Sequence, residues 1–318
     1  MLTFILLLIA GFIILFLAGP RIPVDVTIRT FEIPEDVDSY VKASEARCAD
    51  ILANTEKTII WANPAQKQKT PVAIIYVHGF AATRQETAPL SELVAQQLGA
   101  NLFYTRLTGH GRGGQAMAEA TVNAWLNDAV EAFEIGRRIG EKVLIIGTST
   151  GGTLATWLAT MDHAEDILAC ILISPNFLPQ HPAARLLTLP WAHILFPLIV
   201  GKTWTWKPVN QLHESYWATS HPSSAIFTMM RLVQLVRTAD LRQIRCPVFV
   251  ILSTQDQIVR PDETEKMYAR FSAPIKKKVY LEDSQDPKHH VLAGDILSPN
   301  TTETVARMIS DFVTPLLR

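Results

Sequence analysis

Cysteine is scarce in this sequence, and charge is nearly balanced. The 318 residues include only three cysteines, and none of them forms a C-x-x-C pair. An odd, widely spaced set of this kind excludes a disulfide framework and gives no sign of a zinc site or of redox chemistry. The formal net charge is −1 at pH 7, so no global field attracts nucleic acid. We therefore expect no metal, no cofactor and no nucleic-acid partner.

Internal repeats, low-complexity segments and basic tracts are also missing, whereas apolar residues are abundant. They make up 48% of the chain. Together with the length, this fraction is enough for one large α/β domain that carries an inserted segment.

The N-terminus holds a long apolar run. Residues 2–18 are almost wholly apolar, a length just sufficient to cross a bilayer. No Lys or Arg precedes the run as in a secretory signal, and the residues before Pro20 make a poor cleavage site. We predict a single-pass transmembrane anchor over residues 1–20, rather than a cleaved signal or a buried core helix. Basic residues follow it, which favours a cytoplasmic location for the remaining domain, residues 21–318.

Short apolar segments alternate with amphipathic segments from residue 72 onward, which predicts a mostly parallel sheet covered on both faces. Upstream, residues 24–31 alternate as a short strand would. The alternation stops over residues 176–238, a Pro- and Trp-rich stretch with no clear strand, which we interpret as an inserted helical cap. Strands are expected at residues 58–61, 72–77, 101–104, 143–146, 167–173, 248–253 and 277–281, and helices at 34–47, 90–98, 122–139, 153–160, 262–271 and 302–317.

A turn of small residues follows one of these apolar segments. Residues 143–146 are apolar and residues 147–152 read GTSTGG, which contains the G-x-S-x-G pattern. In a nucleophile elbow, a buried strand turns sharply into a helix and lifts the serine hydroxyl clear of the sheet. Such a turn needs flanking residues without bulk, as Gly147 and Gly151 are. The motif also occurs in ordinary loops, but its position after an apolar strand favours Ser149 as a nucleophile.

A serine nucleophile needs a base and an acid that orients the base. On an elbow of this kind the acid and then the histidine follow the serine, at the ends of later strands. Asp256 lies in the loop after the strand expected at 248–253, which makes it the candidate acid. Two adjacent histidines, His289 and His290, lie in the loop after the last expected strand, and one of them is expected to be the base.

The negative oxygen of a tetrahedral intermediate needs two N–H donors. Residues 77–80, VHGF, follow the first parallel strand. Gly79 lets this loop turn tightly, so the N–H of Phe80 can point into the site. The N–H of Thr150, directly after the nucleophile, is the second candidate donor, and the positive end of the following helix adds to it.

Together these motifs resemble the α/β-hydrolase superfamily, with the greatest similarity to its monoacylglycerol lipase, carboxylesterase and serine aminopeptidase-like branch. The resemblance covers residues 72–317 and implies an eight-stranded, mostly parallel sheet with a helical cap between the sixth and seventh strands. Because HVL followed by Asp295 is typical of the base in such hydrolases, the resemblance favours His290, with His289 as the alternative. The motifs are HGF at 78–80, LTGHG at 107–111, GTSTGG at 147–152, Asp256 with Val259 and Pro261, and His290.

The predicted function is that of a serine hydrolase that cleaves carboxylic esters through an acyl-enzyme. Residues 186–191 and 194–200 of the cap are apolar, and Trp204 and Trp206 follow them. This apolar surface could line an acyl pocket, rest on a membrane or simply pack on the sheet. With the predicted anchor, it indicates a lipid ester such as a monoacylglycerol as the substrate.

Two alternatives remain. An aminopeptidase or amidase on the same scaffold would need an acidic cap residue to hold a substrate amine, and Glu214 is the only carboxylate between Pro175 and Thr238. A non-enzymatic binding protein could also keep the fold. Such proteins usually lose a catalytic residue, whereas Ser149, Asp256 and a histidine are all present here.

Overall fold

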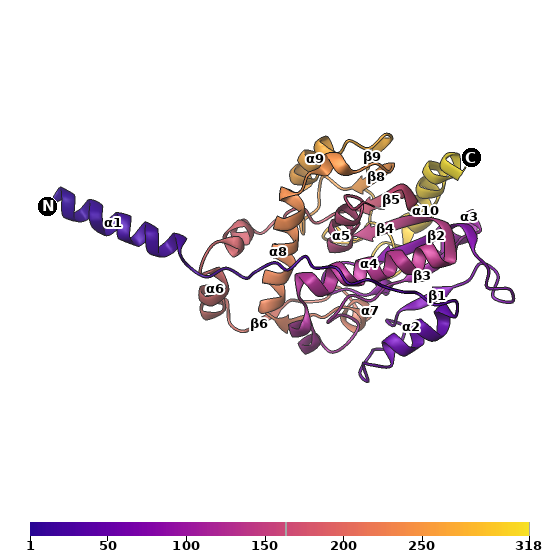
Figure 1. The fold of residues 1–318 in the computed structure, drawn as a ribbon, viewed down its shortest axis with the longest axis horizontal. Coiled ribbons are helices and arrows are strands. Elements are labelled where there is room, and N and C mark those ends of the chain that lie inside the picture. The colour runs from indigo at the N-terminus through magenta and orange to yellow at the C-terminus, as the bar shows by residue number, and fades with distance from the viewer. Residues whose placement is uncertain (163, 318) are drawn as a thin grey trace.

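The computed structural model describes residues 1–162 and 164–317, and a seven-stranded sheet forms its centre. The strand order is β1-β3-β2-β4-β5-β8-β9, and all neighbouring strands are parallel except β1 and β3 (Figure 1). The carboxyl ends of the parallel strands therefore meet at one edge of the sheet. The strands are β1 (Thr58–Ile60), β2 (Thr70–Val77), β3 (Asn101–Tyr104), β4 (Gly140–Thr148), β5 (Ile167–Ile173), β8 (Val248–Leu252) and β9 (Lys276–Tyr280).

Both faces of the sheet are buried. In β2, Ile75 belongs to the core on one face, whereas Ile74 and Tyr76 belong to the core on the other, because successive side chains of a strand point to opposite faces. One face packs against α3 (Leu90–Leu98) and α10 (Pro299–Val313). The opposite face packs against α4 (Val122–Ile139) and α5 (Thr150–Leu158), and α2 (Val37–Glu45), α8 (Ser224–Thr238) and α9 (Pro261–Arg270) contribute to the same core.

The segment predicted as a first strand, residues 24–31, is not a strand. It runs along α4, where Thr27 O accepts hydrogen bonds from Nδ2 of Asn123 (2.8 Å) and of Asn127 (3.1 Å). The N–H of Arg29 donates to Asn127 Oδ1 (2.8 Å). Side-chain amides of a helix thus satisfy backbone groups that a neighbouring strand would otherwise bind. Within the described residues the sheet consequently has seven strands instead of the expected eight, and the cap follows its fifth strand rather than its sixth.

The expected cap region lies between β5 and β8 and contains α6 (Ala192–Val200), α7 (Gln211–Tyr216) and α8. Contrary to expectation it also contains two short strands, β6 (Thr203–Thr205) and β7 (Ser220–Pro222), which pair antiparallel. Each strand is only three residues long, which is too short to give a periodic pattern in the sequence. Short 3₁₀ helices complete the chain: η1 (Arg84–Glu86), η2 (Gly114–Glu119), η3 (Ala164–Asp166), η4 (Pro182–Thr188), η5 (Leu241–Gln243) and η6 (Thr314–Leu317).

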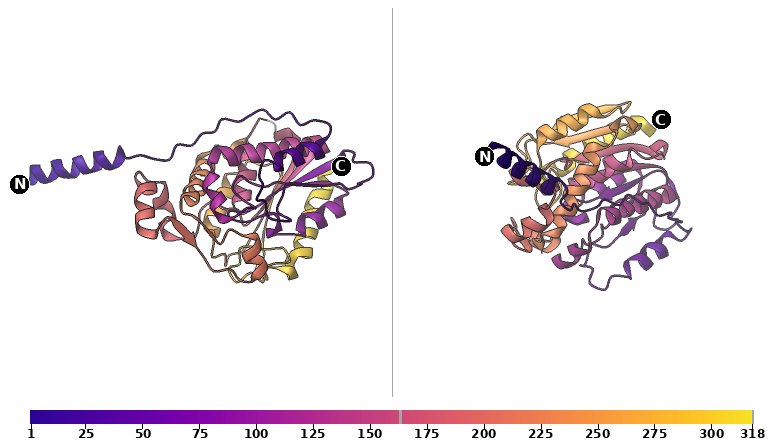
Figure 2. Two further views of the ribbon diagram at one scale, coloured as in Figure 1. Left: turned by 90° about the horizontal axis from the view of Figure 1, so that it is seen from below. Right: turned by 60° about the vertical axis from the view of Figure 1, so that its left-hand side comes forward.

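The apolar N-terminus forms helix α1 (Leu2–Leu17), which extends away from the rest of the molecule (Figures 1 and 2). At about 1.5 Å per residue its 16 residues reach about 24 Å, which is less than the roughly 30 Å of a bilayer's hydrocarbon core. In the part of the chain that the structure describes, no helix combines the length and apolar character needed to cross a membrane. The structure therefore does not support the predicted transmembrane anchor over residues 1–20. It also gives no support to the cytoplasmic location of residues 21–318 that was inferred from that anchor.

Candidate active site

Ser149 occupies a strained turn between β4 and α5. Its backbone angles are φ 54° and ψ −116°, a conformation that residues other than glycine rarely adopt. The turn leaves no room for side chains beside it. A Cβ atom on Gly147 would lie 2.5 Å from the carbonyl oxygen of Gly151, and one on Gly151 would lie 1.9 Å from that of Val77. These contacts explain why small residues flank the serine.

Backbone hydrogen bonds from the neighbouring strand hold the strained residue in place. The N–H of Ser149 donates to the carbonyl of Ile173 at the end of β5 (2.9 Å). The carbonyl of Ser149 accepts from the N–H of Asn176 (2.9 Å) and of Thr153 (3.1 Å). The elbow is therefore built into the sheet edge, with the side chain of Ser149 at the carboxyl end of the central strand.

Asp256 and His290 form a buried pair at the same edge of the sheet. Asp256 lies in the loop after β8, where its Oδ1 accepts the N–H groups of Ile258 (2.7 Å) and Val259 (2.9 Å). Its Oδ2 accepts the Nδ1–H of His290 (2.8 Å). This tautomer leaves Nε2 of His290 without a proton, as a base requires.

The structure pairs His290, and not His289, with Asp256. Asp286 organises the turn, because its Oδ2 accepts the N–H groups of His290 (3.0 Å) and Val291 (2.9 Å). His289 adopts a positive φ of 51°, which turns the chain between the two histidines. Within the described residues no hydrogen bond joins the His289 ring to Asp256.

The pKa of His290 is raised above its usual value of 6.5. Burial alone lowers this pKa, because it disfavours the charged imidazole. The negative charge and hydrogen bond of Asp256 outweigh burial, and the charges of Glu86 and Asp286 add to them. The site therefore favours an imidazolium, the form that a general base becomes when it accepts a proton.

The predicted oxyanion donors lie on two segments that contact each other. Thr150 is the first residue of α5, so its N–H has no partner within the helix. Within residues 1–162 and 164–317, the N–H of Phe80 has no hydrogen-bond partner either. The close approach of Gly151 to the carbonyls of Val77 and His78 brings the two segments together.

Two buried neutral histidines hold the loop that carries Phe80. His78 donates from Nδ1 to the Gly79 carbonyl (2.9 Å) and accepts the Leu107 N–H at Nε2 (3.1 Å). His110 accepts the N–H of Ala81 at Nε2 (3.0 Å). Burial lowers the pKa of His78 to about 4 and that of His110 well below its usual value. Both rings bond to the backbone and serve to position the loop.

Glu86 connects this loop with His290 and was not identified from the sequence. It is buried, and its Oε2 accepts the N–H of Gly79 (2.7 Å) and the hydroxyl of Tyr76 (3.1 Å). The Tyr76 hydroxyl also lies 3.2 Å from that of Thr148, the residue before Ser149. On its other side, the backbone of Glu86 contacts Gly294, four residues after His290. Glu86 thus ties the elbow, the Phe80 loop and the histidine loop into one cluster.

The two halves of the site are not joined directly by a hydrogen bond. Among the described residues, none links the hydroxyl of Ser149 to the ring of His290. Catalytic hydrogen bonds are often long or misaligned without substrate and tighten in the complex. The contacts through Gly151 and Glu86 place both groups in the same buried region.

Substituting Glu86 with glutamine is expected to flatten the pH dependence of stability. Burial raises the pKa of Glu86 to about 7 from its usual value of 4.5, although the bond from Gly79, the charge of His290 and the bond from Tyr76 lower it. Between these values the folded protein keeps a proton that the unfolded chain releases. The contribution of Glu86 to stability is therefore greatest below pH 4.5 and is lost as the pH rises from there through about 7, by about 3 kcal/mol in all.

Glutamine at position 86 cannot ionise, yet its oxygen can still accept the Gly79 N–H. Urea unfolding at pH 5 and pH 8 measures the difference between the two proteins. The natural protein should lose more stability over this interval than Glu86→Gln. An equal loss of stability in both proteins would contradict the raised pKa of Glu86.

The cap region packs against the loop that carries Phe80. The N–H of Ala218 donates to the carbonyl of Ala81 (2.7 Å). The Phe80 ring packs edge-on against His221 of β7, with ring centres 5.2 Å apart. Trp217 belongs to a buried cluster with Ala82 and Val291. Apolar and aromatic residues of the cap region therefore pack against the loop that carries Phe80, one of the proposed oxyanion donors.

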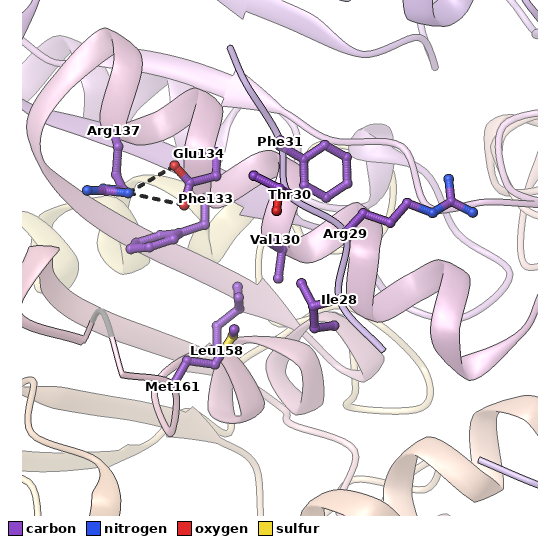
Figure 3. A pocket seen from close by; sticks show the side chains of 10 residues that line it. All are labelled: Ile28, Arg29, Thr30, Phe31, Val130, Phe133, Glu134, Arg137, Leu158 and Met161. Carbon is purple, nitrogen blue, oxygen red and sulfur yellow. Dashed lines mark hydrogen bonds and ion pairs between the residues drawn. The ribbon is translucent and has the colours of Figure 1, made fainter. Parts of the chain in front are cut away.

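A separate hollow of about 370 Å³ lies between residues 28–31 and helices α4 and α5 (Figure 3). Its wall includes Phe31, Phe133 and the ion pair between Arg137 and Glu134 (3.0 Å). Neither the elbow nor the Asp256 loop contributes to it. We therefore do not count it as part of the site.

No group of His, Cys, Asp and Glu side chains in the described part of the chain has an arrangement that could hold a metal ion. The same sheet edge carries the hydroxyl of Ser149, the imidazole of His290 paired with the carboxylate of Asp256, and the backbone N–H groups of Phe80 and Thr150. The sheet order and the strand-to-helix elbow define an α/β-hydrolase fold, and the residues at its edge form a candidate site of the serine-hydrolase type.

Comparison with known proteins identifies the family. The sequence model described as serine aminopeptidase, S33, matches residues 68–285, which is more than half of the chain. The chain belongs to this family of the α/β-hydrolase superfamily, as the motif order implied. It is also 28% identical to a thermostable monoacylglycerol lipase from Bacillus sp. (strain H-257), over 76% of this chain and 92% of that protein.

Solved structures show the same fold. A structure from work on LipS and LipT, two metagenome-derived lipolytic enzymes, superposes with a TM-score of 0.69 and 21% identity, covering 83% of this chain and 99% of that one. A monoglyceride lipase from Saccharomyces cerevisiae superposes with a TM-score of 0.63 and 12% identity, covering 82% and 91%. A monoacylglycerol lipase from Paleococcus ferrophilus gives 0.60 and 15%, covering 82% and 98%.

Proposed function

We propose that this protein is a serine hydrolase that cleaves carboxylic esters through an acyl-enzyme. The observation that carries the proposal is the hydrogen bond from His290 to the buried carboxylate of Asp256, at the sheet edge where the elbow presents Ser149. Membership of a serine-hydrolase family and the similarity to a monoacylglycerol lipase support it.

In the proposed mechanism, Nε2 of His290 takes the proton of Ser149 as its hydroxyl oxygen attacks the acyl carbonyl. The N–H groups of Phe80 and Thr150 stabilise the negative oxygen of the tetrahedral intermediate. His290 then protonates the leaving alcohol, and an acyl-serine remains. Water, activated by the same imidazole, releases the acid. Throughout, Asp256 holds the ring in the required tautomer and stabilises its positive charge.

We further propose that the substrate is a lipid-like ester such as a monoacylglycerol. Phe80 packs in an apolar cluster with Met117, Ala218 and Ala225. Trp217 belongs to a second apolar cluster with Ala82, a residue of the same loop. An acyl chain that leaves water to bind beside these apolar groups gains about 0.8 kcal/mol per buried CH₂ group.

Acyl-chain profiling tests the substrate proposal. The specificity constant kcat/KM for p-nitrophenyl esters should rise from acetyl to octanoyl, by on the order of tenfold or more, as added methylenes become buried. Titration of each ester in detergent-free buffer below its solubility limit measures this trend. A preference for acetyl over octanoyl esters would count against a lipid-like substrate while leaving the esterase proposal intact.

The alternative is an aminopeptidase or amidase, which the description of the matching family favours. Capture of a substrate amine requires a carboxylate close to the site. Glu214, the only carboxylate of the cap region, is exposed on α7. Amino-acid p-nitroanilides offered beside p-nitrophenyl octanoate distinguish the two reactions, and faster cleavage of the anilides would favour the alternative.

A further inference from the structure

One end of the molecule exposes apolar side chains that the fold leaves uncovered. No residue of α1 or of cap helix α6 is buried. In α6, the side chains of Leu198 and Ile199 are 78% and 82% exposed. A helix that is apolar all round is stable only when an apolar environment surrounds it. No segment among residues 1–162 and 164–317 covers these two helices, so they require an apolar partner from outside.

The two helices belong to one surface although they are far apart in the sequence. The N–H of Trp191, just before α6, donates to the carbonyl of Pro20 (3.0 Å), and its indole Nε1–H donates to that of Leu15 in α1 (3.3 Å). The indole packs so closely on Gly19 that a Cβ there would lie 1.9 Å from Nε1. Figures 1 and 2 show α1 continuing outward from this junction beside the cap. We call α1 and α6 with Trp191 the apolar end.

The two segments that form the apolar end carry charged side chains of one sign. No Asp or Glu occurs in residues 1–24 or in residues 167–213, although the whole chain carries a net charge of only −1. The exposed basic residues Arg21 and Lys202 lie four and two residues after the ends of α1 and α6, and Lys207 lies two residues after β6. An apolar surface flanked by basic residues complements the acyl chains and anionic headgroups of a lipid surface.

We propose that the apolar end seats the protein on a lipid surface that contains anionic headgroups, with the apolar side chains of α1 and α6 in contact with the acyl chains. Helices suit this role because their backbone hydrogen bonds are satisfied internally. Trp191 lies between the two helices, and tryptophan is enriched where lipid meets water. A second copy of the chain would bring the same positive charges together, which disfavours a protein cover.

Binding through the apolar end would place the cap region against the lipid surface. That region is hydrogen-bonded to the Phe80 loop through Ala218, so the candidate site would lie close to a source of lipid-like esters. Binding of the apolar end to lipid does not depend on whether the candidate site is an esterase.

Vesicle flotation with the full-length protein tests the proposal. Phosphatidylcholine vesicles with and without phosphatidylglycerol are compared at low and high salt. The double variant Leu198→Glu, Ile199→Glu carries charges on α6, and Leu52→Glu, Ile275→Glu is the matched control on exposed apolar residues elsewhere. Hydrolysis of p-nitrophenyl acetate without lipid and thermal unfolding verify that all proteins are folded.

We expect the natural protein and the control to float with phosphatidylglycerol vesicles, less so at high salt, and the α6 variant to bind about tenfold more weakly or worse. Three results would overturn the proposal: no flotation of the natural protein, equal flotation of the α6 variant, or a lipid-free oligomer that the α6 variant dissociates. The last result would identify a second copy of the chain as the cover.

Discussion

Ser149→Ala is expected to reduce hydrolysis of a short p-nitrophenyl ester by on the order of 10⁴-fold or more, because removal of a nucleophile leaves only binding and oxyanion stabilisation. The substitution removes one oxygen from a residue that is 6% exposed, and its backbone bonds to Ile173 and Asn176 remain. The fold should therefore be retained. Steady-state kinetics and labelling with a fluorophosphonate probe measure the effect, and the natural protein alone should be labelled.

Ser174→Ala is the matched control for this experiment. Ser174 is also buried, with a positive φ of 42°, and follows the neighbouring strand β5. Among the described residues its hydroxyl has no hydrogen-bond partner. We expect full labelling and nearly unchanged kinetics for this variant. Full activity of Ser149→Ala, or no labelling of the natural protein, would favour a binding protein that merely shares the fold.

Asp256→Asn is expected to lower kcat by on the order of 10⁴-fold with little change of structure. The asparagine oxygen can still accept the N–H groups of Ile258 and Val259. Its NH₂ group then faces Nδ1 of His290, which favours the tautomer with the proton on Nε2. That nitrogen can no longer accept the proton of Ser149. The rate should fall even though every side chain remains close to its original position.

The pH profile separates this electrostatic role from a structural one. The base works as neutral imidazole, so kcat/KM rises with pH through the pKa of His290. Because the charge and hydrogen bond of Asp256 raise that pKa, the rising limb of Asp256→Asn should shift to lower pH. His289→Ala is the control and should change neither the rate nor the limb appreciably. A large loss of activity in His289→Ala would instead favour the neighbouring histidine as the base.

Segments whose burial leaves a regular apolar pattern in the sequence were predictable. The strand expected at residues 167–173 and the helix expected at 122–139 have those same bounds in β5 and α4. Their apolar patterns arise because β5 is covered by helices on both faces and α4 buries one face against the sheet. Residues 24–31 also alternate, but their polar backbone groups are satisfied by asparagines of α4. Local alternation cannot distinguish these two kinds of partner.

The candidate site could be proposed from the sequence to the extent that its chemistry requires rare residue types at fixed points. The elbow demands glycines around Ser149, and the order of acid and histidine follows from the sheet. Glu86 was missed because it stands in a short polar stretch, ATRQET, that looks like an ordinary surface loop. Only its burial against Gly79 and Tyr76 distinguishes it from a solvated carboxylate.

By itself, the sequence determined the central alternation of parallel strands and helices and the position of the elbow, because these depend on periodicity and on backbone geometry that few residues tolerate. The α/β-hydrolase fold followed from the resemblance of its motifs to that superfamily. The tertiary structure decided which histidine meets Asp256, which carboxylate braces the Phe80 loop, and that α1 and α6 share one uncovered surface. Each of those results depends on hydrogen bonds or burial between residues distant along the chain. A pattern read along one segment holds no information about the partner that folding brings to it.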